Sequence, residues 1–324
     1  MISVNERAAT IVQEMISEQE ALGFRATKLK NGATVLDAGI HVTGSFEGGR
    51  LFACACLGGL GQVGFTLRDF RGPESNSESD LWFPAVEVSV ESPHIACMAS
   101  QYAGWAVQLD RYFAIGSGPA RALWAGEEIF AKLDYKDQAD TAVLMLEGRT
   151  LPDEEVADFV AQMCGVNPER LFLVIAPTAS VVGSIQVAAR SAETGMHKLA
   201  ELGFDVRCIQ SASGICPLAP VAADDLRAIG RTNDAILYGA QVSFAVRAED
   251  RVLSELIDRV PSESSRDYGT PFYELFQRYN GDFYKIDRML FSPARIEINN
   301  LDSGHTFRAG RLNPSLLRSS LMES

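Results

Sequence analysis

The chain has 324 residues, which is long enough for two domains or for one large domain with a substantial core. Its content of 47% hydrophobic and 22% charged residues is typical of a soluble globular protein. The formal net charge of −13 argues against nucleic acid or a membrane as a partner, because both require a basic surface. No apolar run reaches the length of a membrane span, and the N-terminus predicts an amphipathic helix and not a signal peptide. We therefore expect a cytoplasmic protein.

Apolar spacing in the first part of the chain predicts a helix followed by strands. The helical periodicity begins at Val4 and is expected to end near Gly23. The dipeptide Asn31-Gly32 predicts a tight hairpin between two short strands within residues 24–39. The continuous apolar run 51–57 is interpreted as a further strand.

Residues 59–64, GLGQVG, match the G-x-G-x-x-G pattern of dinucleotide-binding proteins. In those proteins the last glycine opens a helix whose N-terminus binds the pyrophosphate. The residues that follow here, FTLRDF, alternate between apolar and polar and end at Gly72-Pro73, which predicts a strand and a turn. We therefore interpret the glycines as sites of close backbone packing and reject a nicotinamide-dependent enzyme.

The second part of the chain predicts helices layered on a sheet. Strands are expected at 141–147, 171–177 and 206–211, and helices at 151–164 and 184–204. This β–α–β order favours an α+β fold in which helices cover the sheets.

Further on, residues 235–246 predict a strand and residues 272–279 an aromatic-rich helix. The aromatic residues of this region are most simply core residues at helical spacing, and the alternative is a stacking wall for a planar ligand. They are Tyr268, Phe272, Tyr273, Phe276, Tyr279, Phe283 and Tyr284.

Residue types that bind metals lack the spacing of ligands. The six cysteines lie singly in apolar segments apart from Cys54 and Cys56, and there is no CxxC pair. No two of the four histidines are spaced i,i+2 or i,i+4, and no nucleophile elbow is present. We therefore predict reduced core cysteines and no metal site.

Arg190 and Glu193 are three positions apart on the predicted helix 184–204, so they lie one helical turn apart. The simpler interpretation is an ion pair on a solvated helix face, because such pairs are common. The alternative is a carboxylate base whose charge and bound water are controlled by the neighbouring guanidinium. Spacing alone leaves both interpretations open.

Seven long segments carry a more specific signal than any of these short motifs. They are NGATVLDAG, CLGGLGQVG, HIACMASQYAGW, YFAIGSGPARAL, APTASVVGSIQVAARSAETG, RTNDAILYG and SSRDYGTPFYELF. Together, and in this order, they resemble the methenyltetrahydromethanopterin cyclohydrolase family, and the resemblance extends over nearly the whole chain.

The resemblance implies an enzyme that reversibly hydrolyses 5,10-methenyltetrahydromethanopterin to 5-formyltetrahydromethanopterin in one-carbon metabolism, in formaldehyde oxidation or methanogenesis. It implies that no metal or redox cofactor takes part. It assigns the catalytic roles to Glu193 as general base and to Arg190, which tunes Glu193 and positions the water. It also implies a homotrimer.

The resemblance further implies that Gln101, Tyr102 and Ala103 bind the substrate next to the reacting carbon. Archaeal members of the family carry lysine at the position of Tyr102, so that positive charge is absent here. Arg121, in SGPARA, is a weak candidate for binding the phosphate-bearing tail of the substrate.

We predict two α/β-layered domains that enclose a substrate cleft. The first is expected to span 1–135 and to carry the 101–103 segment, and the second to span 136–324 and to carry the Arg190/Glu193 helix. A discontinuous division is left open. Two alternative functions also remain: a cyclohydrolase that acts on the folate analogue, and a non-catalytic pterin-binding protein of the same fold.

Overall fold

The computed structural model describes residues 2–71, 80–281 and 285–322. The chain forms two units, and each unit combines two separate segments of sequence. Unit 1 contains 1–62 and 94–186, and unit 2 contains 63–93 and 187–324. This α+β organisation with one six-stranded sheet for each unit agrees with the predicted fold class. The division differs from the expected boundary at residue 135, because strands within 136–186 pair with strands of the N-terminal segment.

The sheet of unit 1 has the strand order β1-β2-β8-β7-β6-β5. Its strands are β1 Arg25–Lys28, β2 Thr34–Asp37, β5 Trp105–Leu109, β6 Tyr112–Ser117, β7 Ala142–Glu147 and β8 Leu171–Ala176. The central strands β2, β8 and β7 run parallel, and the outer pairs are antiparallel.

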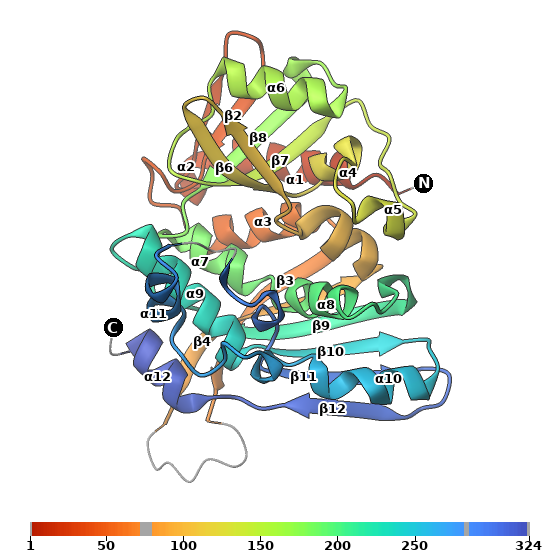
Figure 1. Ribbon diagram of the computed structural model, residues 1–324. Coiled ribbons are helices and arrows are strands. Elements are labelled where there is room, and N and C mark those ends of the chain that lie inside the picture. Colours follow the sequence, from red (N-terminus) through yellow and green to blue (C-terminus); the bar gives the residue numbers. More distant parts are fainter. Residues whose placement is uncertain (1, 72–79, 282–284, 323–324) are drawn as a thin grey trace. The chain divides into compact units, whose positions relative to one another are not determined.

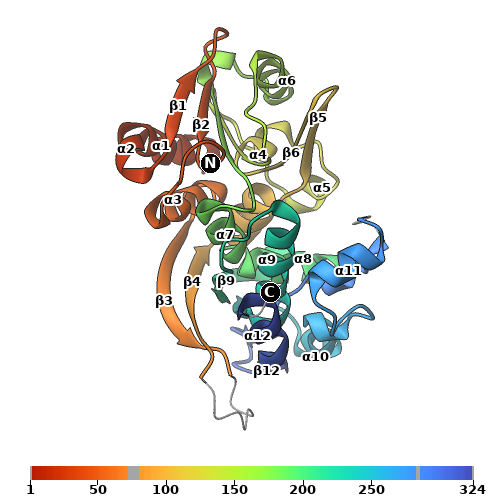
Figure 2. The same cartoon turned by 90° about the vertical axis from the view of Figure 1, so that its left-hand side faces the viewer.

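The helices of unit 1 lie on both faces of this sheet. They are α1 Val4–Ser17, α2 Gln19–Leu22, α3 Phe46–Cys56, the π-helix η1 His94–Gln101, α4 Ala120–Trp124, α5 Phe130–Leu133, α6 Glu154–Cys164, the 3₁₀ turn η2 Pro168–Arg170 and most of α7 Val181–Ala188. Figure 1 and Figure 2 show α6 on one face and α1 to α3 on the other.

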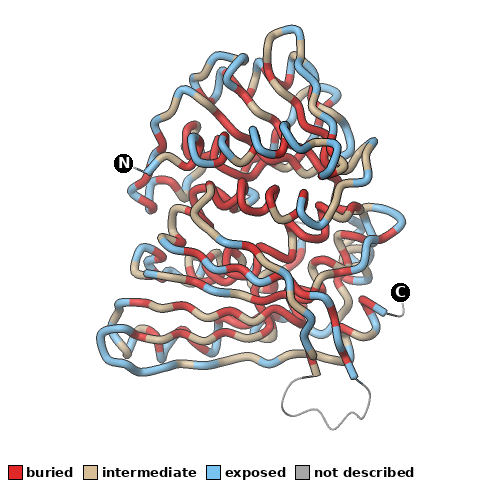
Figure 3. Tube along the Cα trace, turned by 180° about the vertical axis from the view of Figure 1, so that it is seen from behind, coloured by how far each residue is buried: buried red, intermediate tan, exposed pale blue. Residues whose placement is uncertain are grey.

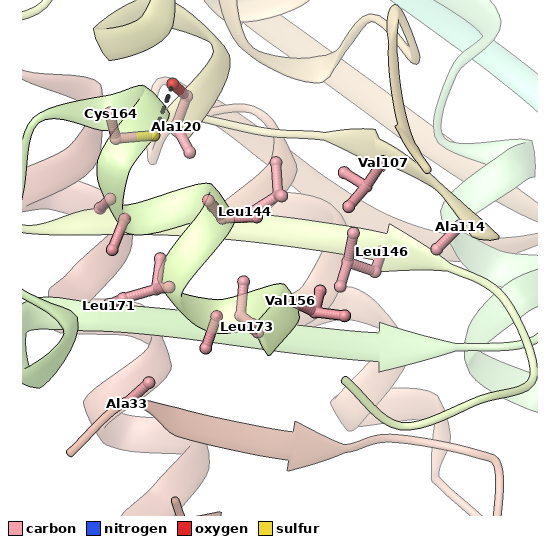
Figure 4. Close-up of a cluster of buried hydrophobic side chains, with 14 of the residues drawn as sticks. Ala33, Val107, Ala114, Ala120, Leu144, Leu146, Val156, Cys164, Leu171 and Leu173 are labelled. Carbon is pink, nitrogen blue, oxygen red and sulfur yellow. Dashed lines mark hydrogen bonds between the residues drawn. The ribbon is translucent and has the colours of Figure 1, made fainter. Parts of the chain in front are cut away.

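Alternating side chains of the central strands fill the two cores of unit 1. Leu144 and Leu173 point toward α6, where they pack with Val156 (Figure 4). Val143 and Val174, one residue away in each case, pack with α1 and α3 on the opposite face. This period of two, with both faces apolar, is the pattern of a sheet that is covered by helices on both sides.

Two predictions in the N-terminal segment had different outcomes. The hairpin is confirmed, because β1 pairs antiparallel with β2 and Gly32 has the positive φ of 91° that its turn requires. The strand at 51–57 is wrong, because these residues continue the helix α3, whose N-cap Ser45 accepts a hydrogen bond from Gly48 N. Residues 51–56 are all buried, so the run has no periodicity that could separate a strand from a buried helix.

The sheet of unit 2 has the strand order β12-β11-β10-β9-β4-β3. Its strands are β3 Gly61–Asp69, β4 Trp82–Glu91, β9 Ile209–Pro217, β10 Gln241–Val246, β11 Arg295–Asn300 and β12 Thr306–Gly310. The pair β10–β11 is parallel, and β4–β9, β9–β10 and β11–β12 are antiparallel. In Figure 3 these strands alternate between buried and less buried positions, as expected for a sheet with one covered face.

Helices α8 and α9 pack on this sheet against β9. The helical segments of unit 2 are α8 Ser191–Glu201, η3 Val206–Cys208, α9 Asp225–Gly239, α10 Asp250–Leu256, η4 Ile257–Arg259, η5 Ser262–Ser264, α11 Phe272–Arg278, η7 Arg288–Leu290 and α12 Pro314–Met322.

The structure of unit 2 decides two predictions, one for the residues after the glycine motif and one for the aromatic region. Residues Gly61–Asp69 form strand β3, so the strand predicted after the glycine motif is confirmed. Phe272 is fully buried and its ring contacts Phe276 and Phe291, which supports core packing. Phe283 and Tyr284 lie outside the described residues. The strand predicted over 235–246 is wrong in its first part, because α9 extends to Gly239.

One buried carboxylate joins three helices of unit 2. Asp234 on α9 accepts hydrogen bonds from Phe272 N at the start of α11 (2.8 Å) and from Ser320 Oγ on α12 (2.6 Å). Burial raises the pKa of Asp234 from its ordinary value of 3.8 to about 7. The folded state therefore binds this proton more tightly than the unfolded chain does, and this contribution to stability is lost as the pH rises from about 4 to about 7.

We expect Asp234→Asn to raise the Tm at pH 8 by several degrees and to leave it nearly unchanged at pH 4. The amide keeps an acceptor for Phe272 N and removes the buried charge, and each unit of pKa shift corresponds to about 1.4 kcal/mol. The measurement is Tm against pH for both proteins.

Asp250→Asn is a control for which we expect the opposite change in Tm. Asp250 accepts hydrogen bonds from Ser303, Asn300 and His305, and these lower its pKa. Its removal should therefore destabilise the protein at neutral pH and have little effect in acid. A lower Tm for Asp234→Asn at pH 8 would show that the charged form of Asp234 is the stabilising one.

Candidate active site

Arg190 and Glu193 lie where one helix ends and the next begins. The expectation of a single helix over 184–204 is wrong, because α7 ends at Ala188 and α8 begins at Ser191. Arg190 is the N-cap residue of α8, and its backbone N–H donates to Val187 O (2.9 Å). Glu193 is therefore in the first turn of α8. The partial positive charge of a helix N-terminus stabilises an anion at such a position.

The two side chains form a close and largely buried charge pair. Arg190 Nη1 lies 3.7 Å from Glu193 Oε2, and the side chains are 10% and 8% exposed, respectively. This distance is longer than that of a charge-assisted hydrogen bond, so the contact is electrostatic. The burial of the pair favours a functional carboxylate over the solvated helix face considered above, because a surface pair of this kind would remain hydrated.

Two features of the structure place positive charge beside the Glu193 carboxylate. They are the Arg190 guanidinium, 3.7 Å away, and the N-terminus of α8. An ionised carboxylate held in this way can accept a proton from a bound water.

Helix α8 is held firmly in unit 2 at both ends. At its start, a Cβ added to Gly214 of β9 would lie 2.4 Å from Ser191 Oγ, so a larger residue at this position would have to displace the Ser191 side chain. Toward its end, Lys198 is buried and its Nζ donates to Ser264 Oγ (3.2 Å) and to Met289 O. Burial lowers the pKa of Lys198 to about 8. A fixed helix is what a carboxylate needs in order to meet a reacting atom reproducibly.

The second group of predicted residues follows the π-helix η1 in unit 1. Gln101 is the last residue of η1 and is buried, Tyr102 is partly buried and Ala103 is exposed. Tyr102 N donates to Cys97 O (2.7 Å), an i to i−5 bond that continues the π-helical pattern. Such π-helical turns are rare and occur frequently at functional sites.

The structure gives Arg121 protein partners within unit 1. Its side chain is 0% exposed and forms a bidentate pair with Glu127 (2.7 Å for each bond). A phosphate-binding arginine must be accessible to the phosphate, so this burial disfavours the tail-binding role. Sequence reasoning missed Glu127, because a six-residue separation across a loop carries no helical or strand periodicity.

Over residues 2–71, 80–281 and 285–322, no three His, Cys, Asp or Glu side chains are grouped so that they could hold a metal ion. Within the same residues, no helix is long and apolar enough to cross a membrane.

Comparisons with known proteins cover both groups of residues. A family model described as "Cyclohydrolase (MCH)" matches residues 3–321. The methenyltetrahydromethanopterin cyclohydrolase of Methanosarcina barkeri is 42% identical over 320 residues, which are 98% of this chain and 97% of that protein. The proteins of the same name from Methanococcus maripaludis strain S2 and Methanocaldococcus jannaschii are 45% and 44% identical, each over 99% of this chain and 98% of their own length.

Proposed function

Because the chain belongs to the methenyltetrahydromethanopterin cyclohydrolase family, we propose that it reversibly hydrolyses 5,10-methenyltetrahydromethanopterin to 5-formyltetrahydromethanopterin. The observation that carries the proposal is the buried Arg190–Glu193 pair at the start of α8. It supplies a base and a cation within one helical turn, on a helix that is fixed at both ends.

In the first step, a water attacks the methenyl carbon. This carbon is part of a cationic amidinium and is already electrophilic, so the enzyme has to position the water and accept its proton. Glu193 is the general base, and the Arg190 guanidinium orients the water and keeps Glu193 ionised until the proton is transferred. The product of this step is a neutral tetrahedral carbon that bears one hydroxyl and both nitrogens.

In the second step, one carbon–nitrogen bond breaks. Protonated Glu193 returns its proton to the aryl-amine nitrogen, which leaves as a neutral amine, and the formyl group stays on the pterin nitrogen. The hydroxyl proton goes to solvent. One proton is therefore released for each methenyl cation hydrolysed, and Glu193 ends the cycle ionised.

Gln101, Tyr102 and Ala103 are proposed to bind the substrate beside the reacting carbon. Their position at the end of a π-helix and the hydrogen bond from Tyr102 N to Cys97 O support this role. The substrate cleft itself stays a prediction. We do not extend the proposal to Arg121 as a contact for the substrate tail, because its side chain is buried against protein partners.

The decisive experiment compares methenyltetrahydromethanopterin and methenyltetrahydrofolate as substrates of the purified protein. We expect hydrolysis of the first, followed by the loss of methenyl absorbance, and much slower hydrolysis of the second. Preference for the folate compound would replace the proposed substrate. Binding of the methanopterin compound without hydrolysis would identify a pterin-binding protein.

Hydrolysis is expected to continue at full rate after exhaustive chelation. Water addition to a cationic carbon does not require a Lewis acid, and Glu193 supplies the base. The measurement is turnover before and after chelation and dialysis, with metal content determined on the same samples. Lost activity that zinc restores would show that a metal takes part.

On the basis of the family, we also propose that the protein is a homotrimer and that it is located in the cytoplasm. We propose that it works in formaldehyde oxidation or methanogenesis. Light scattering at micromolar concentration should give three times the mass of one chain. A single-chain mass at that concentration would contradict the trimer.

A further inference from the structure

One buried guanidinium stabilises the end of η1 in unit 1. Arg121 Nη1 donates to Met98 O and to Ser100 O, each at 3.0 Å. The last carbonyls of a helix have no partner within the helix and carry the negative end of its dipole. Arg121 therefore supplies both hydrogen bonds and a positive charge immediately before Gln101.

Glu127 fixes the orientation of this guanidinium. Its Oε1 accepts from Arg121 Nε and its Oε2 from Arg121 Nη2, and its side chain is only 12% exposed. A bidentate pair of this kind holds the plane of the guanidinium. Removing one member would leave the other charge buried and unpaired, so the two side chains act as a single structural unit.

The segment after Gln101 packs against the same pair. The Tyr102 ring centroid lies 5.1 Å from Arg121 Cζ, which is within the range of a cation–π contact. A Cβ added to Gly104 would lie only 1.8 Å from Glu127 Oε2 and 2.7 Å from Tyr102 Cε1. Residues 101–103 are thus held between the helix end on one side and Gly104 on the other, where a Cβ would have to displace the Glu127 carboxylate.

We propose that Arg121 and Glu127 are positioning residues, which hold Gln101-Tyr102-Ala103 in the one conformation that binds the substrate. This inference rests on the proposed function, because the proposed function assigns substrate binding to residues 101–103. The contacts described above show how these residues are held. Neither side chain needs to touch the substrate. The pair acts through the carbonyls of η1 and through the Tyr102 ring.

The test uses three single variants that disturb the pair in different ways. Arg121→Lys keeps a charge and loses the planar fork, Glu127→Gln keeps the shape and loses the negative charge, and Gly104→Ala displaces the Glu127 carboxylate without altering either partner. For each folded variant we expect kcat/KM for methenyltetrahydromethanopterin to fall by about tenfold or more, mainly through a higher KM. Amide hydrogen exchange of the peptide spanning 98–104 should become faster.

Two controls separate positioning from loss of stability. Val160→Ala truncates a buried core residue on α6 and should lower the Tm while leaving KM and exchange at 98–104 unchanged. Tyr102→Phe retains the ring over Arg121, whereas Tyr102→Leu removes it. We expect amide exchange at 98–104 to stay near wild type for the first, to become faster for the second, and to show a non-additive effect when Tyr102→Leu is combined with Arg121→Lys.

Failure of the inference and failure of the proposed function would give different results. Wild-type KM and wild-type exchange at 98–104 in folded Arg121→Lys and Gly104→Ala would overturn the inference. If Arg121→Lys does not fold, Gly104→Ala and Glu127→Gln decide the question. If the wild-type protein hydrolyses neither substrate, the proposed function fails, and the exchange measurement still shows whether the pair holds the segment.

Discussion

Glu193→Gln should lower kcat by roughly 10² to 10⁴ and leave KM close to its wild-type value. The amide preserves the shape of the side chain and most of its hydrogen-bonding capacity, so the substrate should still bind. The variant cannot accept the proton of the attacking water, and that proton transfer is what a positioned general base contributes to the rate. The measurement is steady-state hydrolysis of methenyltetrahydromethanopterin, with a melting curve for each protein.

Glu201→Gln is the matched control for this variant. It makes the same chemical change on the same helix, at an exposed glutamate that lies 3.7 Å from His197 Nε2. We expect it to retain wild-type kcat, because an exposed side-chain contact contributes little and Glu201 has no proposed role. A folded Glu193→Gln with turnover close to that of Glu201→Gln would remove Glu193 from the mechanism.

Arg190→Lys should lower kcat/KM by roughly 10², the scale of losing one well-placed donor at a reacting centre. Lysine retains the positive charge near Glu193, but its ammonium cannot reproduce the planar fork that is proposed to orient the water. Arg190→Gln removes the charge as well, so it should lower kcat/KM further than Arg190→Lys does.

Arg207→Lys serves as the control for the arginine variants. Arg207 is an exposed residue of unit 2 whose guanidinium pairs with Asp205, so the same substitution there should leave kcat/KM unchanged. If Arg190→Lys and Arg190→Gln both kept wild-type kcat/KM, Arg190 would have no part in the mechanism.

Much of the central sheet of unit 1 could be predicted from local sequence. The hairpin around Asn31-Gly32, strand β7, strand β8 and helix α6 all have local causes: a turn dipeptide, short apolar runs and a capping Asp153. The run at 51–57 failed because every residue from 51 to 56 is buried, and burial on all sides removes the periodicity that separates a helix from a strand.

The spacing of Arg190 and Glu193 was sufficient to nominate a charge pair, and the long matching segments were sufficient to identify the family. Spacing could not show that the helix is interrupted before Arg190, because no glycine or proline marks the interruption. It could not show that Glu193 lies at a helix N-terminus, where the dipole stabilises its charge. Nor could it show that the pair is largely buried.

The sequence by itself therefore determined the fold class and the family and nominated the residues of the candidate site, because each of these depends on patterns along the chain. Only the tertiary structure decided the environment of those residues. Arg121 demonstrates the difference, because its sequence context suggested a phosphate contact, whereas its carbonyl, carboxylate and aromatic partners come from residues 98 to 130. Burial and charge balance depend on which distant residues pack together, and that packing is set by the three-dimensional fold and not by spacing along the chain.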